Sequence, residues 1–177
     1  LADGTKVSQS TSLSRSGDWP LHIPLYAGKG TLLSWLVFAK DSNSDLSGTL
    51  SWIKQAGIKS KYYPGGFTCE CAAFGSTYRR TDPILNLPTA SLTFSGGGLA
   101  SDLTKPITIG PRSTVVTSGT DLKLSFSLST GTFNGTIIDP ATGKRLPFSG
   151  AVFQKLNTAY GMLLGAGDQT SAVYLAP

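Results

Sequence analysis

The stretch 133–155 constrains the fold most, because it has the pattern of a hairpin with a glycine inside each predicted strand. Two runs of β-favouring side chains flank the segment 139–143, whose proline and glycine are typical of a turn. A glycine inside a strand weakens it unless the backbone bends or another group packs closely there. Because Gly135 and Gly150 are paired across this hairpin, the pattern predicts a coiled or barrel-like sheet.

Parts of this hairpin recur elsewhere. Three pairs of segments resemble one another: 46–50 and 133–137, 63–67 and 148–152, and 3–6 and 142–145. The recurrence indicates three degenerate copies of one β unit, the first of which lacks its opening strand. Chance is the alternative explanation, because short Gly-Thr matches arise easily in a chain with 21 glycines.

The absent strand predicts an open sheet edge near residues 1–13, with a weakly alternating strand over residues 5–13. Such an edge can accept a strand from a preceding part of a longer parent chain or from another copy of this chain. Pro20 and Pro24 lie in the alternating run 19–26, which is therefore expected to be an edge strand or an extended segment.

No window of 11 or more residues shows a sustained helical period, and Glu70 is the only glutamate, although helix surfaces favour glutamate. We therefore expect an all-β fold with little or no helix, made of mainly antiparallel sandwich or barrel-like sheets built from degenerate hairpin repeats. A single β domain over residues 1–177 is expected, with sub-units 1–45, 46–100 and 101–177.

Further strands follow from apolar alternation between turns. They are expected near residues 31–38, 46–53, 66–74, 90–95, 106–109, 113–118, 122–128, 160–165 and 171–175. The run 31–38 is apolar on both faces, which indicates a central strand with Trp35 in the core.

The net charge is +5, but the basic residues are scattered. The densest group lies between residues 52 and 63, where Lys54, Lys59 and Lys61 stand among aromatic residues. This pattern suits a solvated hairpin loop or a site for single-stranded nucleic acid. We favour the loop and expect no nucleic-acid partner, and no apolar run is long enough to predict a membrane-spanning helix.

The two cysteines, Cys69 and Cys71, are two positions apart and face the same side of a strand. Their Cα atoms would lie roughly 6.5–7 Å apart, with parallel side chains, which does not suit a disulfide. Phe67 and Ala73 share their face, so both thiols are expected to be reduced and buried.

No catalytic set is evident. His22 is the single histidine, it lies in the proline-rich run, and no Gly-x-Ser-x-Gly motif is present. Most aspartates lie in predicted turns, and Glu70 is expected to face solvent, so a pair of catalytic carboxylates is not indicated. We expect a non-enzymatic protein without a cofactor.

Asp41, Asn43 and Asp45 have the spacing of the first ligands of a calcium loop. However, Leu46 replaces the glycine of that loop, and Trp52 replaces its bidentate glutamate. An ordinary polar turn is therefore favoured, with these three residues as weak metal-ligand candidates.

Aromatic residues supply the alternative function, since their rings can stack on sugar faces. The candidates for such a ligand-binding surface are Trp19, Trp52, Tyr62 and Tyr63, with core packing as the competing interpretation.

The glycine and apolar positions of both ends of the chain resemble a β-rich module, often C-terminal, of large secreted bacterial surface proteins. The resemblance covers most of the chain and rests on the stretches 3–6, 19–35, 135–155, 160–165 and 171–175. It implies an extracellular β module with no assigned activity and supplies no catalytic residues.

Taken with the composition, which is only 14% charged, this resemblance leads us to expect a non-catalytic structural or assembly module of a secreted or cell-surface protein. Its partners would be neighbouring domains of a larger chain or another copy. A carbohydrate-binding module, with polysaccharide as partner, is the alternative, and an enzyme is a third candidate. The specific ligand, the parent protein and the oligomeric state do not follow from the sequence.

Overall fold

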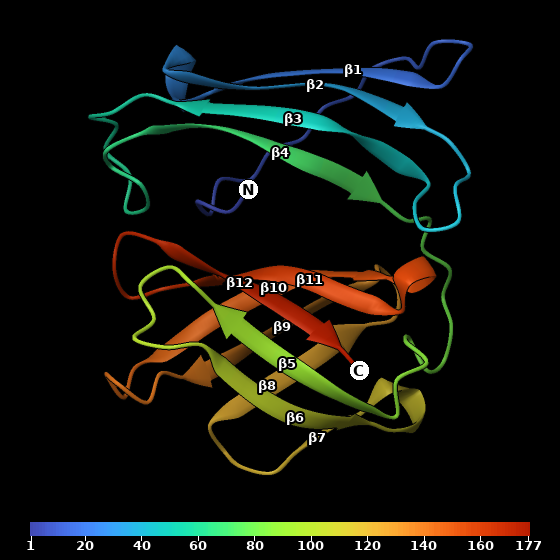
Figure 1. Ribbon diagram of the computed structural model, residues 1–177, viewed down its shortest axis with the longest axis vertical. Coiled ribbons are helices and arrows are strands. Elements are labelled where there is room, and N and C mark those ends of the chain that lie inside the picture. Colours follow the sequence, from blue (N-terminus) through green and yellow to red (C-terminus); the bar gives the residue numbers. More distant parts are fainter. The chain divides into compact units, whose positions relative to one another are not determined.

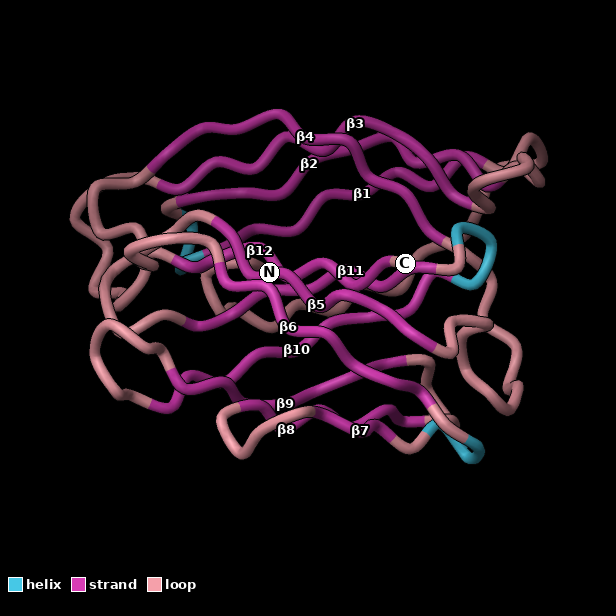
Figure 2. The backbone as a smooth tube through the Cα atoms, turned by 60° about the horizontal axis from the view of Figure 1, so that its bottom comes forward, coloured by secondary structure: helices cyan, strands magenta, loops and turns pink.

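Strands make up nearly all regular structure in the computed structural model, which describes residues 1–177 (Figure 2). The helical segments are three-residue 3₁₀ turns, η1 (Tyr26–Gly28), η2 (Pro111–Ser113) and η3 (Gln154–Leu156). None of these turns is long and apolar enough to cross a membrane. The predicted all-β fold class is confirmed.

Two compact units divide the chain. Unit 1 contains Leu1 and Asp3–Ser76, and unit 2 contains Ala2 and Thr77–Pro177. The division falls at the start of an irregular stretch, and it does not coincide with the expected sub-unit boundaries after residues 45 and 100.

Unit 1 is built on a four-stranded antiparallel sheet whose strands follow chain order (Figure 1). Its strands are β1 (Asp18–Leu25), β2 (Gly30–Phe38), β3 (Leu46–Lys54) and β4 (Phe67–Gly75). Alternate side chains point to opposite faces of a strand. One face, the inner face, therefore carries the buried cluster of Leu21, Leu25, Leu32, Leu36 and Trp52.

The predicted edge strand is present as β1, which pairs only with β2. The carbonyl of His22 accepts a long hydrogen bond of 3.4 Å from the Gln9 side chain, so the backbone of His22 points away from β2. Pro20 and Pro24 are two residues before and after His22, so their backbone nitrogens, which carry no hydrogen, also point to the outer edge. Prolines in this position prevent a further strand from pairing regularly with the edge, because they lack N–H donors.

The strand predicted over residues 5–13 is wrong, because regular structure begins only at β1. Most side chains of this segment are polar. Its two large apolar residues, Val7 and Leu13, are exposed by 37% and 51%, so the segment buries too little apolar surface to hold a strand against the sheet.

Unit 2 is an antiparallel, barrel-like eight-stranded sheet in the order β7-β6-β5-β12-β11-β10-β9-β8 (Figure 1). Its strands are β5 (Thr89–Ser95), β6 (Leu103–Ile109), β7 (Val115–Thr117), β8 (Leu122–Ser127), β9 (Thr132–Ile138), β10 (Arg145–Phe153), β11 (Thr158–Leu164) and β12 (Thr170–Ala176). The pairing of β5 with β12 joins the first and last strands of the unit. The core includes the fully buried Leu92, Phe94, Ile137 and Leu163.

The sequence predicted that the two glycines of the hairpin lie opposite each other, but they are two positions out of register; at each of them another group packs closely, as expected. Gly135 lies opposite Phe148, and Gly150 lies opposite Phe133, across β9 and β10. Each phenylalanine ring covers the glycine of the other strand, where a Cβ atom would overlap the ring and a neighbouring backbone carbonyl. The two rings have centroids 6.2 Å apart and fill the centre of the curved sheet.

Candidate functional site

An exposed apolar surface occupies the outer face of the β1–β4 sheet. Because Leu32 and Leu36 of β2 point inward, the alternating residues Leu33, Trp35 and Val37 point outward. Trp35 is 69% exposed, and Leu33, Val37 and Phe74 are exposed by 39%, 37% and 40%. We name these four residues the Trp35 face.

A shallow groove crosses β1, β2 and β3 beside Trp35. Its lining includes Pro20, His22, Leu33, Trp35, Thr49 and Ser51. His22 lies opposite Leu33 in the sheet, and the Ser51 hydroxyl donates a hydrogen bond to the Glu70 carboxylate on β4. The groove thus combines one indole face with an imidazole and hydroxyl groups.

Two of the predicted ligand-binding residues are in the interior. Trp52 and Tyr62 are each only 7% exposed. The Trp52 ring packs edge-on against Phe67, with centroids 4.7 Å apart and planes at 89°. Neither ring can therefore stack on a surface ligand, contrary to the candidate surface predicted from the sequence.

The other two candidates, Trp19 and Tyr63, are half-buried. Trp19 stacks on Phe38, with centroids 5.9 Å apart, and Tyr63 packs at 77° against Phe67. Trp35, predicted to be in the core, is instead the exposed tryptophan. The pattern of a strand that is apolar on both faces did not reveal that only one face of β2 is covered.

A buried polar cluster joins the start of the chain to β3, and no sequence pattern indicated it. Lys54 Nζ lies 3.1 Å from Asp3 Oδ2, and the two side chains are 0% and 1% exposed. The Tyr26 hydroxyl donates to Asp3 Oδ2 at 2.5 Å, and the Thr5 N–H donates to Asp3 Oδ1 at 3.0 Å. Trp52 Nε1 in turn donates to the Tyr26 oxygen at 3.2 Å.

The loop between β3 and β4 completes this cluster. Lys54 Nζ donates to the Tyr62 carbonyl at 2.7 Å and to Ser60 Oγ at 3.0 Å. It also lies 4.8 Å from the centroid of the Tyr26 ring. The loop, which was expected to be solvated, therefore closes over Lys54 at the end of β3, and of the three lysines only Lys59 and Lys61 are exposed.

Opposing effects set the ionisation of the cluster. Burial alone would raise the pKa of the Asp3 carboxyl, but hydrogen bonds from Tyr26, Thr5 and Lys54 outweigh it and hold that pKa below its usual value. Burial and the neighbouring Asp3 raise the pKa of Tyr26 to about 12. The phenol therefore keeps its proton at neutral pH and remains a hydrogen-bond donor to Asp3.

The segment 41–45 forms a polar turn. The Asp41 N–H donates to the Ser44 carbonyl at 2.9 Å, and the Asp45 N–H donates to the Gly75 carbonyl at 2.8 Å. Asp41 and Asn43 are exposed, and the structure contains no group of three or more His, Cys, Asp or Glu side chains that could hold a metal ion.

The two cysteines are free and share the inner face, since Cys69 pairs with Trp52 and Cys71 pairs with Leu50. However, only Cys69 is partly covered, whereas Cys71 is exposed. The predicted burial of Cys71 is wrong: β4 is an edge strand, and the core cluster partly covers Cys69 but leaves Cys71 exposed.

We expect a maleimide reagent to label Cys71 in the folded protein well before Cys69. Partial desolvation, followed by the nearby Cys69, raises the pKa of the Cys71 thiol, so its labelling should accelerate as the pH rises above neutral. The rates can be followed by mass spectrometry, with Cys71→Ser as the control that leaves only the slow thiol. Equal rates for both thiols would contradict this placement.

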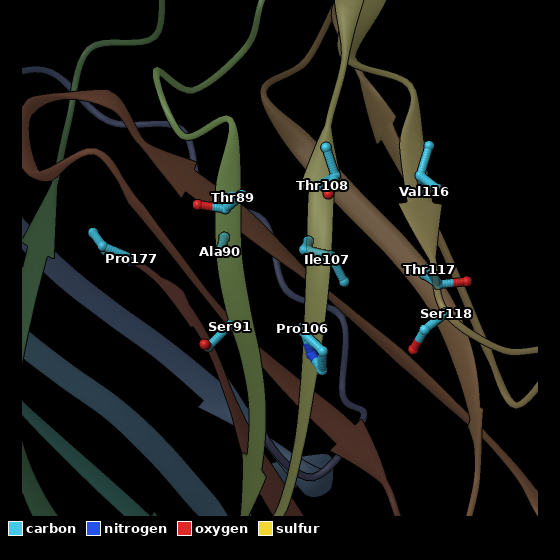
Figure 3. A pocket seen from close by; sticks show the side chains of 10 residues that line it. All are labelled: Thr89, Ala90, Ser91, Pro106, Ile107, Thr108, Val116, Thr117, Ser118 and Pro177. Carbon is cyan, nitrogen blue, oxygen red and sulfur yellow. The ribbon is translucent and has the colours of Figure 1, made fainter.

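A second shallow hollow lies on the outer surface of unit 2, across β5, β6 and β7 (Figure 3). Its lining includes the hydroxyl groups of Thr89, Ser91 and Thr108, together with Pro106 and Val116. The side chains that line this hollow carry no ionisable group.

Comparisons with protein-family models, with curated proteins and with solved structures found no match to the chain. Proposals about its function therefore rest on the residues of the two units themselves.

Proposed function

We propose that the chain is a non-catalytic structural or assembly module of a secreted or cell-surface bacterial protein, and that the Trp35 face is its contact surface. The exposed Trp35, flanked by Leu33 and Val37 on the same strand, is the observation that supports this function. Contiguous exposed apolar side chains are typical of interaction sites, and tryptophan is enriched among the residues that dominate binding energy.

The partner is a neighbouring domain of a larger chain or a second copy of this one. The outer edge of β1 is a poor docking site, because Pro20 and Pro24 remove donors that a new strand would need. Contact through the face of the sheet requires no backbone donors. The proposed assembly therefore uses side chains of the Trp35 face rather than strand addition at the outer edge of β1.

Self-association measured by analytical ultracentrifugation, from micromolar to near-millimolar concentration, tests this proposal. Trp35→Ser is expected to weaken association at least about tenfold, because the indole supplies the largest apolar area of the face. Val116→Ser is the matched control, since Val116 is 62% exposed but lies on unit 2. A wild-type chain that stays monomeric throughout would exclude a second copy as the partner.

Carbohydrate binding is the second candidate, and the groove beside Trp35 favours it. An exposed indole next to hydroxyl and imidazole groups suits the apolar face and polar rim of a pyranose ring. Titration with neutral polysaccharides, followed by tryptophan fluorescence in the wild type and in Trp35→Ser, distinguishes the two candidates. Unchanged fluorescence in both proteins would count against sugar binding.

A further inference from the structure

The two edges of the β1–β4 sheet differ in their protection. At the outer edge of β1, Pro20 and Pro24 lack N–H donors, and the carbonyl of His22 already accepts a hydrogen bond from Gln9. β4 forms the other edge (Figure 1), and its nine residues include no proline and no lysine, two residues that commonly protect an edge strand. β4 is therefore the less protected edge of this sheet.

The hydrogen-bond pattern of the sheet fixes which backbone groups of β4 point outward. The N–H of Gln55, just after β3, donates to the Lys29 carbonyl in the register of β2 with β3. Because the direction of the backbone groups alternates along a strand, Leu50 of β3 faces β4, and Cys71, which lies opposite Leu50, faces back to β3. The residues whose backbone groups point away from the sheet accordingly include the exposed Thr68, Glu70 and Ala72.

We propose that β4 pairs with β4 of a second copy of this chain, antiparallel and around a two-fold axis, so that the two four-stranded sheets become one. A two-fold contact needs only one self-complementary surface, which here is a single strand. The contact uses backbone groups of β4 and is separate from the Trp35 indole, so it goes beyond the assembly through the Trp35 face.

Strand length and charge select the register of this pairing. Cys71 is the middle residue of β4, so an axis at Cys71 overlaps the two strands along their full length. The same axis sets Glu70 opposite Ala72 of the second copy, where the outward N–H and C=O groups of both residues pair. An axis at Glu70 would instead set two carboxylates directly opposite each other, which is unfavourable. Each Glu70 carboxylate also accepts a hydrogen bond from Ser51, which holds it over its own sheet.

Cys71 provides a specific reporter of this register. On the axis it faces Cys71 of the second copy in a pair that is not hydrogen-bonded, and the Cα atoms of such pairs are about 4.5 Å apart. That distance lies within the range of disulfides, which is about 4.4–6.8 Å. Cys71 is exposed, whereas Cys69 is partly covered and would lie opposite Ala73 of the second copy. A disulfide between the two Cys71 thiols therefore indicates the proposed pairing.

Disulfide trapping in the 177-residue chain tests the proposal. Oxidised glutathione takes two electrons and two protons from a pair of thiols, and non-reducing gel electrophoresis separates the covalent dimer from the single chain. Cys69→Ser, which leaves Cys71 as the only thiol, should form the dimer at least about tenfold faster than Cys69→Ser/Cys71→Ser/Gly98→Cys. Gly98 is exposed and a side chain there meets no atom within 4 Å, so this control reports random collisions. Equal rates would overturn the proposal.

Charge variants at two exposed positions, all in the Cys69→Ser background, test the register itself. Ala72→Lys places an ammonium group opposite Glu70 of the second copy and should raise the dimer yield about threefold or more, although lysine ordinarily protects a sheet edge. Ala72→Glu and Glu70→Lys/Ala72→Lys place like charges opposite each other, and both should lower the yield. Two lysines beside Cys71 would favour its thiolate, so a gain in Glu70→Lys/Ala72→Lys would show that the charges act on the thiol and would overturn the proposal.

The same measurement distinguishes this contact from the Trp35 face. In the Cys69→Ser background, Trp35→Ser should leave the yield of the Cys71 dimer unchanged, even where it weakens association in the ultracentrifuge. Loss of the Cys71 dimer in that variant would assign the contact between copies to the Trp35 face instead of β4.

Discussion

Gly150→Ala is expected to destabilise unit 2 by about 3 kcal/mol or more, the upper range for overpacking a core. The added Cβ would overlap the Tyr160 carbonyl, the Phe133 ring and the Cα of Gly161. Two of these three obstacles are backbone atoms of the neighbouring strand, which cannot move without disrupting the pairing of β10 with β11.

Urea unfolding followed by far-ultraviolet circular dichroism measures this effect. Trp19, Trp35 and Trp52 all lie in unit 1, so tryptophan fluorescence serves as a separate probe of that unit. Gly98→Ala is the control, because a Cβ at Gly98 meets no atom within 4 Å. If the free energy of unfolding of Gly150→Ala lies within about 0.5 kcal/mol of the wild-type value, the packing described for these glycines is contradicted.

Sequence patterns predicted most strands well because buried and exposed residues alternate in many of them, as in β5 and β8. The alternating run at residues 122–128 became β8, and the glycine-bearing hairpin became β9 and β10. Even the edge position of β1 followed from Pro20 and Pro24. These features are local, and a strand reveals its two faces within a few residues.

The positions of the candidate site residues could not be predicted from local patterns. Whether the second apolar face of β2 is covered depends on what packs against it, so Trp35 was expected in the core, whereas Trp52 was among the surface candidates, with core packing as the competing interpretation. Likewise, Lys54 resembled a solvated loop residue. Its partner Asp3 is 51 positions away, and a pair separated by that distance leaves no periodic signal in the chain.

Lys54→Met is expected to destabilise unit 1 by about 3–5 kcal/mol, because it leaves the Asp3 carboxylate buried without a cationic partner. The loop between β3 and β4 also loses the hydrogen bonds from Nζ to the Tyr62 carbonyl and to Ser60. Tryptophan fluorescence during urea unfolding measures the loss, since Trp52 belongs to the same hydrogen-bonded cluster. Lys105→Met, which breaks the exposed ion pair with Asp121, should change stability little.

The double variant Lys54→Met/Asp3→Asn distinguishes two causes of the lost stability, the unpaired charge of Asp3 and the lost packing of the Lys54 side chain. Asparagine can still accept hydrogen bonds from Tyr26 and Thr5 through its side-chain oxygen, but it carries no charge. The double variant should therefore be more stable than Lys54→Met alone, although it has one more substitution in the cluster. If the second substitution instead lowers stability further, the loss in Lys54→Met comes from packing, and Asp3 is not the group that requires the lysine.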